Sequence, residues 1–306
     1  MKQTVIKIIC IVFANVAGIL TTCASAQEPE ISWLKMMPEI PTDLTEPDQR
    51  AAFLVAHFWD QFNLNDTSFL MTNHLLERCF IEYIDLLSLV PDELRDQSIQ
   101  SFLKKSEDEG NLFTFIISLS EKYLYEPESP LCNDEKLIPF LQYALGSSIL
   151  NESEKFRLNY LLDCISKNRI GNIANDFTYT LMNGETGNLH TIEAEYTLLY
   201  FNDPDCDDCR MLIRQLTVSP IISQYVQAGR LKIITFYVND DLDTWKKHAR
   251  EVSHSWIYAY DAEQIINAET IYNIKQFPAL YLLNQYKKVI LKDLTFETLE
   301  DYFRSP

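Results

Sequence analysis

Residues 196–216 read Tyr196-Thr-Leu-Leu-Tyr-Phe-Asn-Asp-Pro-Asp-Cys206-Asp-Asp-Cys209-Arg-Met-Leu-Ile-Arg-Gln-Leu216. The apolar run from Thr197 to Phe201 predicts a buried central strand, and the apolar spacing after Cys209 predicts a helix. A polar turn with a proline separates the two, so Cys206 falls at a helix N-terminus. Backbone N–H groups and the helix dipole stabilise a thiolate at such a position. Cys209 lies one helical turn further on, where it can resolve a mixed disulfide at Cys206.

The overall composition limits the kind of protein this is. The chain has 306 residues, 47% of them apolar, which is enough for about two domains with buried cores. It carries 26 basic and 44 acidic residues, so its formal net charge is −18. Such a surface repels phosphate backbones, and we therefore expect no nucleic acid among its partners.

The first 26 residues have the features of a secretory signal peptide. A basic start is followed by the apolar run from Ile8 to Leu20 and by the small-residue cleavage site Ala24-Ser-Ala26. We therefore expect an exported, periplasmic protein with no transmembrane segment after signal removal. An alternative is a lipoprotein anchored through Cys23, although Thr22 is a poor residue before a lipidated cysteine.

Helical periodicity dominates residues 49–170, after an extended, proline-containing lead-in at residues 27–48. We predict an all-helical domain of five to seven helices and of unknown function. The motif His57-Phe-Trp-Asp60 is interpreted as aromatic core with polar edges, since amphipathic helices usually have this pattern. The apolar stripes comprise Ala51, Leu54, Val55, Phe58 and Phe62; Leu76, Phe80, Tyr83 and Leu87; Leu112, Phe115, Ile116, Leu119 and Tyr123; Leu137, Leu141 and Leu145; and Phe156, Tyr160 and Cys164.

From residue 171 onward the period changes from helical to strand-like, and strands alternate with helices. This alternation, with a terminal hairpin and helix, predicts a mixed α/β sheet. We expect a β-hairpin around Asn183-Gly184 and an N-cap at Asp240. The remaining expected elements are helices at 220–228, 241–251, 262–272 and 295–303, and strands at 231–238, 256–260, 277–283 and 288–292.

Residues 171–304 resemble thioredoxin-fold domains of the exported TlpA/ResA type. The resemblance rests on a hairpin that starts with Asp176-Phe177, on Cys206-x-x-Cys209 after the central strand, and on Phe277-Pro278 at the start of a later strand. The helical half resembles an uncharacterised domain that precedes such redoxin domains in Gram-negative envelope proteins. We therefore expect a multidomain chain, with an all-α domain at 49–170 followed by an α/β thioredoxin fold at 171–306.

The resemblance implies a thiol–disulfide oxidoreductase of the cell envelope. Cys206 would be the attacking thiolate and Cys209 the resolving thiol. Pro278 would be cis, and the backbone of Phe277 would pair with an extended substrate. The expected partners are protein or small-molecule disulfides and a redox partner protein, with no cofactor. The alternative is a non-catalytic thioredoxin-fold binding module whose helical domain recruits a partner.

The sequence departs from the family around the two cysteines. Asp205 stands where family members often have an aromatic residue, Asp207-Asp208 stand where Gly-Pro or Glu-Pro is common, and Tyr200 replaces a buried acid. Carboxylates in the first helical turn suit the helix dipole but disfavour a neighbouring thiolate. We therefore expect a disulfide that is hard to reduce, which favours a disulfide reductase. The same acids are expected to steer basic partners to the site.

The other cysteines and the histidines give no second site. Cys79 and Cys164 lie on apolar helical faces and are interpreted as buried thiols, while Cys132 lies in a loop. A Cys79–Cys164 disulfide stays open, because spacing does not establish it. We expect no metal site, because there is no second cysteine pair and because three histidines are isolated in the sequence: His190, His248 and His254.

Overall fold

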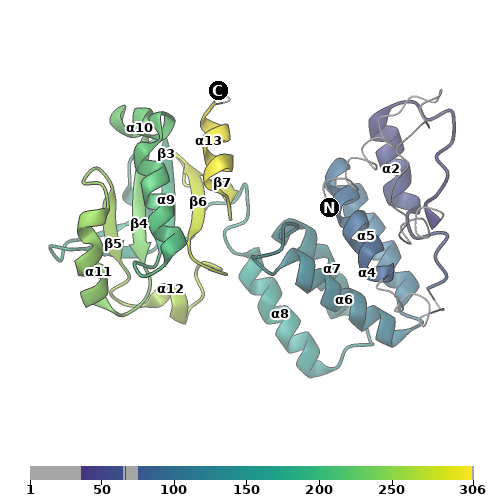
Figure 1. Cartoon of the computed structure of the whole chain (residues 1–306). Helices are drawn as coiled ribbons and strands as arrows, with labels where there is room; N and C mark the ends of the chain where they lie inside the picture. The colour runs from purple at the N-terminus through teal and green to yellow at the C-terminus, as the bar shows by residue number, and fades with distance from the viewer. Residues whose placement is uncertain (1–35, 65, 67–74, 305–306) are drawn as a thin grey trace. The chain divides into compact units, whose positions relative to one another are not determined.

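The computed structural model describes residues 36–64, 66 and 75–304, which form two compact units. The chain divides between Asn159 and Tyr160, inside helix α8 (Glu152–Ser166), into a helical unit and a unit that contains a sheet (Figure 1). The predicted signal peptide, with Cys23, lies outside the described residues. Among the residues described, no helix is both long and apolar enough to cross a membrane. The domain limits expected from the sequence stay predictions.

The first unit is helical in all its described elements, which confirms the predicted all-α half. The predicted stripe around Phe58 is buried, and Trp59 stacks on Phe102 with the ring centroids 3.9 Å apart. His57 and Asp60 form an exposed ion pair at 2.7 Å, so this motif is core with polar edges, as predicted. The helices are α2 (Pro47–His57), α4 (Leu75–Leu86), α5 (Asp92–Ser106), α6 (Gly110–Leu124) and α7 (Asp134–Gly146), with the 3-10 helix η3 (Leu87–Leu89) after α4.

One predicted stripe is wrong at Phe156 and Tyr160, although its third member, Cys164, is buried as predicted. The Phe156 and Tyr160 side chains are 78% and 58% exposed, whereas Leu158, Leu161 and Ile165 are buried. Both sets have helical spacing, because α8 carries apolar residues on two faces. Periodicity alone therefore could not decide which face of α8 enters the core.

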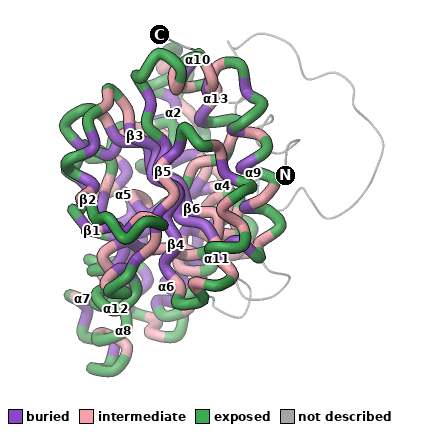
Figure 2. The backbone as a smooth tube through the Cα atoms, turned by 90° about the vertical axis from the view of Figure 1, so that its left-hand side faces the viewer, coloured by how far each residue is buried: buried purple, intermediate pink, exposed green. Residues whose placement is uncertain are grey.

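The second unit contains a seven-stranded sheet with the order β2-β1-β5-β4-β3-β6-β7. Figure 1 labels β3 to β7 of this sheet. The β3–β4 and β4–β5 pairs are parallel and the other pairs are antiparallel. β3 lies between β4 and β6 and is buried along nearly its whole length (Figure 2), as predicted for the central strand. The strands are β1 (Thr178–Leu181), β2 (Thr186–Asn188), β3 (Tyr196–Asn202), β4 (Leu231–Tyr237), β5 (Ile257–Tyr260), β6 (Ala279–Asn284) and β7 (Val289–Lys292).

Each face of the sheet has its own apolar core, because successive side chains of a strand point to opposite faces. Leu198 and Tyr200 of β3 enter the core that α9, α10 and α13 also line, whereas Leu199 and Phe201 enter the other core. The helices are α9 (Asp207–Val218), α10 (Pro220–Gln227), α11 (Leu242–His248), α12 (Ile265–Ala268) and α13 (Phe296–Arg304), with 3-10 helices η4 (Leu189–Thr191) and η5 (Ala249–Glu251).

Two expectations for this unit need correction. The helix predicted at 262–272 is only the single turn α12, because Gln264 and Thr270 on either side of it have positive φ angles of 55° and 47°. The N-cap of α11 is Asp241 rather than Asp240, since the Asp241 side chain accepts the Thr244 backbone N–H at 3.1 Å. The predicted hairpins β1–β2 and β6–β7 are both confirmed.

A buried lysine, Lys287, forms hydrogen bonds at the amino end of β3. Lys287 is 4% exposed, and its Nζ donates to the Ile192 carbonyl at 2.5 Å and to the Thr197 hydroxyl at 2.9 Å. Burial lowers the pKa of Lys287. Because buried polar groups need hydrogen-bond partners, these two bonds hold the β6–β7 turn against the start of the central strand.

Candidate active site

A tight loop joins the carboxyl end of β3 to α9 and places Cys206 at the N-cap of that helix. The Asp203 carboxylate accepts the Asp205 backbone N–H at 2.9 Å, and the Asp203 carbonyl accepts the Cys206 N–H at 3.1 Å. From the loop after β4, the Asn239 side-chain amide donates to the second Asp203 carboxylate oxygen at 2.8 Å. The loop is therefore fixed by its own hydrogen bonds and by one from the loop after β4.

The two cysteines of the pair have different environments. The Cys206 sulfur is partly exposed and accepts the Cys209 backbone N–H at 3.3 Å. Cys209 is 1% exposed, and burial raises the pKa of its thiol to about 12. The Tyr200 hydroxyl, buried beneath the helix, donates to the Cys209 carbonyl at 2.8 Å. The first sulfur is accessible to a partner and receives an N–H donor, whereas the second is covered.

The predicted substrate-side residues lie against Cys206. The Phe277–Pro278 peptide bond is cis, as the sequence predicted. The Cys206 sulfur lies 3.7 Å from the Phe277 carbonyl oxygen. The antiparallel register of β3 with β6 pairs Phe201 with Ala279, which brings this segment beside the cysteine loop. The structure therefore places Phe277 and Pro278 next to Cys206.

The predicted acidic residues have unequal surroundings. Asp207 forms an ion pair with Arg210, whose guanidinium also donates to the Pro204 carbonyl at 3.0 Å. Asp208 is exposed and has no ion pair or side-chain hydrogen bond with any residue that the structure describes. Of the two carboxylates in the first turn of α9, one is therefore compensated and the other is open to solvent. Arg210 is a site residue that the sequence reading missed.

His248 also lies at this site, although the sequence reading treated it as isolated. Its Nε2 is 3.7 Å from an Asp205 carboxylate oxygen, and its Nδ1 is 2.7 Å from a Glu251 carboxylate oxygen. Its side chain is only 15% exposed. The spacing of His248 and Glu251 is a helical i, i+3 pair that sequence inspection could have found. The contact with Asp205 joins residues far apart in the chain and gives no such signal.

The other cysteines that the structure describes are free thiols. Cys79 and Cys164 are buried thiols and are not joined in a disulfide. The partly buried Cys132 donates its S–H to the Tyr125 carbonyl at 3.5 Å. Across the described ranges, no three histidine, cysteine or acidic side chains gather in a way that would hold a metal ion.

Comparison with known proteins gives the family. A thioredoxin-like protein from Bacteroides caccae matches this chain with a TM-score of 0.85 and 38% sequence identity, covering 88% of this chain and 97% of that one. This chain belongs to the thioredoxin-like proteins. The thioredoxin fold expected for its second half and its order of helical and α/β parts are thereby confirmed.

Other matches cover parts of this thioredoxin-like protein. Residues 20–168 match a domain of unknown function, DUF5106. The C-terminal domain of an uncharacterised protein from Bacteroides fragilis is 40% identical, covers 45% of this chain and 99% of its own, and has a TM-score of 0.45. The thioredoxin domain of a thiol-disulfide oxidoreductase from Bacteroides vulgatus is 20% identical, covers 44% and 98%, and has a TM-score of 0.39. No curated protein matches the chain.

Proposed function

We propose that this thioredoxin-like protein is an exported thiol–disulfide oxidoreductase that reduces disulfides, with Cys206 as nucleophile and Cys209 as resolving thiol. The observation that carries the proposal is the unequal exposure of the two sulfurs at the N-terminus of α9. A partner disulfide can reach the Cys206 sulfur, which accepts a backbone N–H at 3.3 Å, whereas Cys209 is 1% exposed. Exchange by two thiols in sequence requires this difference.

The chemistry balances without a cofactor. The Cys206 thiolate attacks one sulfur of the substrate disulfide, the substrate S–S bond breaks, and the first substrate thiolate leaves and takes up a proton. Cys209 then attacks the Cys206 sulfur of the mixed disulfide, and its proton goes to the second leaving thiolate. The substrate gains two electrons and two protons, and the protein is left with a Cys206–Cys209 disulfide. A dithiol of a redox partner protein would reduce that disulfide again.

The high pKa of Cys209 suits the second role. Burial holds this thiol protonated at neutral pH, so it does not compete with Cys206 for the incoming disulfide. Once the mixed disulfide forms, the Cys209 sulfur is one helical turn from the sulfur that it attacks. Its carbonyl stays bonded to the Tyr200 hydroxyl, which holds the first turn of α9 in place for this step.

An extended substrate segment is proposed to dock along Phe277 and Pro278. The Phe277 carbonyl oxygen lies 3.7 Å from the Cys206 sulfur, so a segment laid against this backbone would bring its disulfide over Cys206. Protein or small-molecule disulfides that present an extended backbone are therefore the proposed substrates. Backbone pairing of this kind gives affinity with little demand on side chains.

The local charges support reduction rather than oxidation. Asp205 is 74% exposed on its side chain, and Asp208 is exposed without an ion-pair partner in the described structure. Both lie within two residues of Cys206 in the sequence, and Arg210 pairs with Asp207. Negative charge disfavours a thiolate, so it favours the disulfide form of the protein and the transfer of electrons to substrates.

A glutathione redox titration of residues 27–306 tests the proposal, scored by alkylation of Cys206 and Cys209. We expect one reversible two-electron transition at a potential more negative than that of the glutathione pool. Cys132→Ser, which removes the other partly exposed thiol, should leave this transition unchanged. A transition more positive than the glutathione pool would make the protein an oxidase or isomerase. If no reversible pair is found, the non-catalytic binding module is the better function.

The proposed export is tested separately by the mass of the protein's N-terminus. Cleavage after Ala26 would give an unmodified protein that begins at Gln27 and is released with the periplasmic fraction. A lipid-modified Cys23 as the first residue, with the protein in the membrane fraction, would support the lipoprotein instead. An uncleaved Met1 would contradict both forms of export signal.

A further inference from the structure

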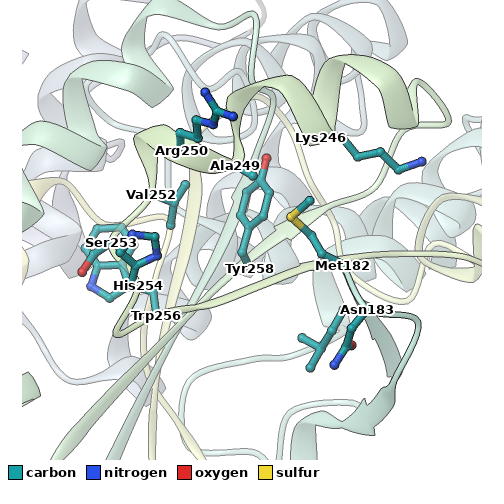
Figure 3. A pocket seen from close by; sticks show the side chains of 11 residues that line it. Met182, Asn183, Lys246, Ala249, Arg250, Val252, Ser253, His254, Trp256 and Tyr258 are labelled. Atoms are coloured by element: carbon teal, nitrogen blue, oxygen red, sulfur yellow. The ribbon is translucent and has the colours of Figure 1, made fainter.

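A groove of about 580 Å³ lies on the second unit, and neither cysteine of the pair lines it. It is lined by the end of β1 and the following turn, by α11 and η5, and by the start of β5 (Figure 3). The pairing of β1 with β5 ends at Leu181 and Ala259, so Tyr258 lies beyond the last paired residues of β1. Because β1 turns away there, one side of Tyr258 faces the groove.

Three cationic or titratable side chains line this groove without a partner. Lys246, Arg250 and His254 are exposed, and none has an ion pair or hydrogen bond with any residue of the described structure. The lining contains these three basic residues and no acidic one. A groove lined in this way favours an anionic ligand.

The dipole of α11 accounts for the position of only one of these three basic residues. Lys246 lies in the last turn of α11, where a cation is favourable. Arg250 and His254 lie beyond the end of that helix and gain little from its dipole. His248, which lies between Lys246 and Arg250 in the sequence, does not line the groove and instead contacts Asp205 and Glu251. The basic residues of this segment therefore face two different places.

The floor of the groove is apolar and rigid. Trp256 and Val252 are buried, and the Tyr258 ring stacks on Trp245 with the centroids 4.8 Å apart. The Tyr258 hydroxyl donates to the Trp245 carbonyl at 2.7 Å, so its polar end is already used. The Met182 side chain is 53% exposed and faces the same space (Figure 3). An apolar side chain of a ligand would therefore find an aromatic wall and a flexible thioether.

We propose that this groove binds an acidic, apolar peptide segment of a partner protein. Its carboxylates would pair with Lys246, Arg250 and His254, and an apolar side chain between them would pack on Trp256, Tyr258 and Met182. The positive charge of the groove requires a negatively charged partner segment, and the apolar floor requires an apolar side chain in that segment. The volume is suited to a few side chains rather than to a folded surface. This inference concerns binding and does not depend on thiol chemistry.

The test uses residues 27–306 labelled with 5-fluorotryptophan and followed by fluorine NMR. The probe is the N-acetylated, C-amidated peptide Glu-Phe-Glu-Leu-Glu-Phe at low ionic strength. We expect saturable movement of the Trp256 signal, assigned with Trp256→Phe, while the Trp59 signal of the helical unit stays in place. The peptide with Lys for each Glu should bind at least about tenfold more weakly, because its charge is reversed. A peptide with Ser for each apolar residue should also lose binding.

Variants decide whether the groove is the binding place. Lys246→Gln with Arg250→Gln should weaken binding about tenfold, whereas Lys232→Gln, an exposed lysine on β4, should change it less than about twofold. Unchanged melting temperatures would show that the variants are folded. The proposal would be overturned if the Trp256 signal did not move at millimolar peptide. It would also be overturned if the lysine peptide bound equally well, or if the double variant bound the peptide like the wild type. A Trp256 signal that depends on protein concentration without peptide, with a dimer lost in the double variant, would assign the groove to a second copy and also overturn it.

Discussion

Helices α4 and α9 each carry a cysteine followed three residues later by a second titratable side chain, yet the two cysteines differ sharply. Cys79, inside α4, is fully buried, and burial raises the pKa of its thiol to about 12. Cys206, at the N-cap of α9, is partly exposed, and its sulfur accepts a backbone N–H. A cysteine therefore becomes a candidate nucleophile through its place at the helix start and its access to solvent. The comparison can be tested at both helices.

The largest effect is expected at Cys206 itself. Cys206→Ser should lower the rate of disulfide reduction at least about 1,000-fold, because it removes the attacking sulfur. Cys209→Ser should still be attacked but not resolved, and should accumulate a mixed disulfide that mass spectrometry detects. Cys79→Ser is the matched control at α4 and should retain the activity. Reduction by Cys206→Ser at the wild-type rate would contradict the assigned roles.

In the folded protein, the alkylation rates of Cys206 and Cys79 should differ by about 100-fold. Iodoacetamide reaches Cys206 in the folded protein, whereas Cys79 must wait for α4 to open. The measurement is peptide mass spectrometry after timed alkylation, with a urea-unfolded sample in which the two rates become similar. Equal rates in the folded protein would mean that burial does not protect the α4 thiol.

Glu82, three residues after Cys79 in α4, is expected to make the stability of the protein depend on pH. Burial raises the pKa of Glu82 from 4.5 to about 7, and the negative charge of Asp85 adds to the rise. The folded state therefore binds a proton that the unfolded state releases, and the stability from this group, present below pH 4.5, is lost as the pH rises through 7. Because Glu82 is only partly buried, Glu82→Gln should raise the free energy of unfolding at pH 8 by about 1 kcal/mol.

Urea unfolding at pH 4.5 and pH 8 measures this effect. Glu93→Gln, an exposed acid on α5, removes the same charge without burial and is the control. It should leave the difference between the two pH values as it is in the wild type. A Glu82→Gln variant that keeps the wild-type pH dependence would show that this carboxyl is solvated like Glu93.

The smallest effect is expected at His248. The imidazole contacts both the Asp205 and the Glu251 carboxylate, and a ring N–H beside a carboxylate offsets part of its negative charge. His248→Gln should therefore slow alkylation of Cys206 about two- to threefold at low salt, and high salt should remove the difference. His254→Gln, outside these contacts, should have no effect. An unchanged alkylation rate in His248→Gln would show that these contacts do not alter the reactivity of the Cys206 sulfur.

The features that sequence could predict are local ones. The apolar run Thr197 to Phe201, the two cysteines after it and the Phe277-Pro278 pair each carry their signal within a few residues, and the structure has them as expected. The contact of His248 with Asp205 joins segments more than forty residues apart, and no periodicity reports it. Sequence reading therefore found the two thiols and the acids beside them, but not Arg210 and His248, which contact two of those acids.

The errors in the fold have the same physical origin. In α8 two apolar faces compete, and only the packing decides that Leu158 rather than Phe156 is buried. At residues 262–272 the composition suits a helix, but Gln264 and Thr270 adopt left-handed backbone conformations that confine α12 to one turn. Tertiary packing overrides the weak local preference at both places.

The burial of Lys287 allows chemical footprinting to follow opening of the sheet at the amino end of the central strand. Its amine is held by the Ile192 carbonyl and the Thr197 hydroxyl and is hidden from reagents, while the next residue, Lys288, is exposed. An acylating reagent should therefore modify Lys288 at once and Lys287 only when the sheet opens. The ratio of modified Lys287 to modified Lys288 over time therefore measures how often the sheet opens, and no label has to be introduced into the protein.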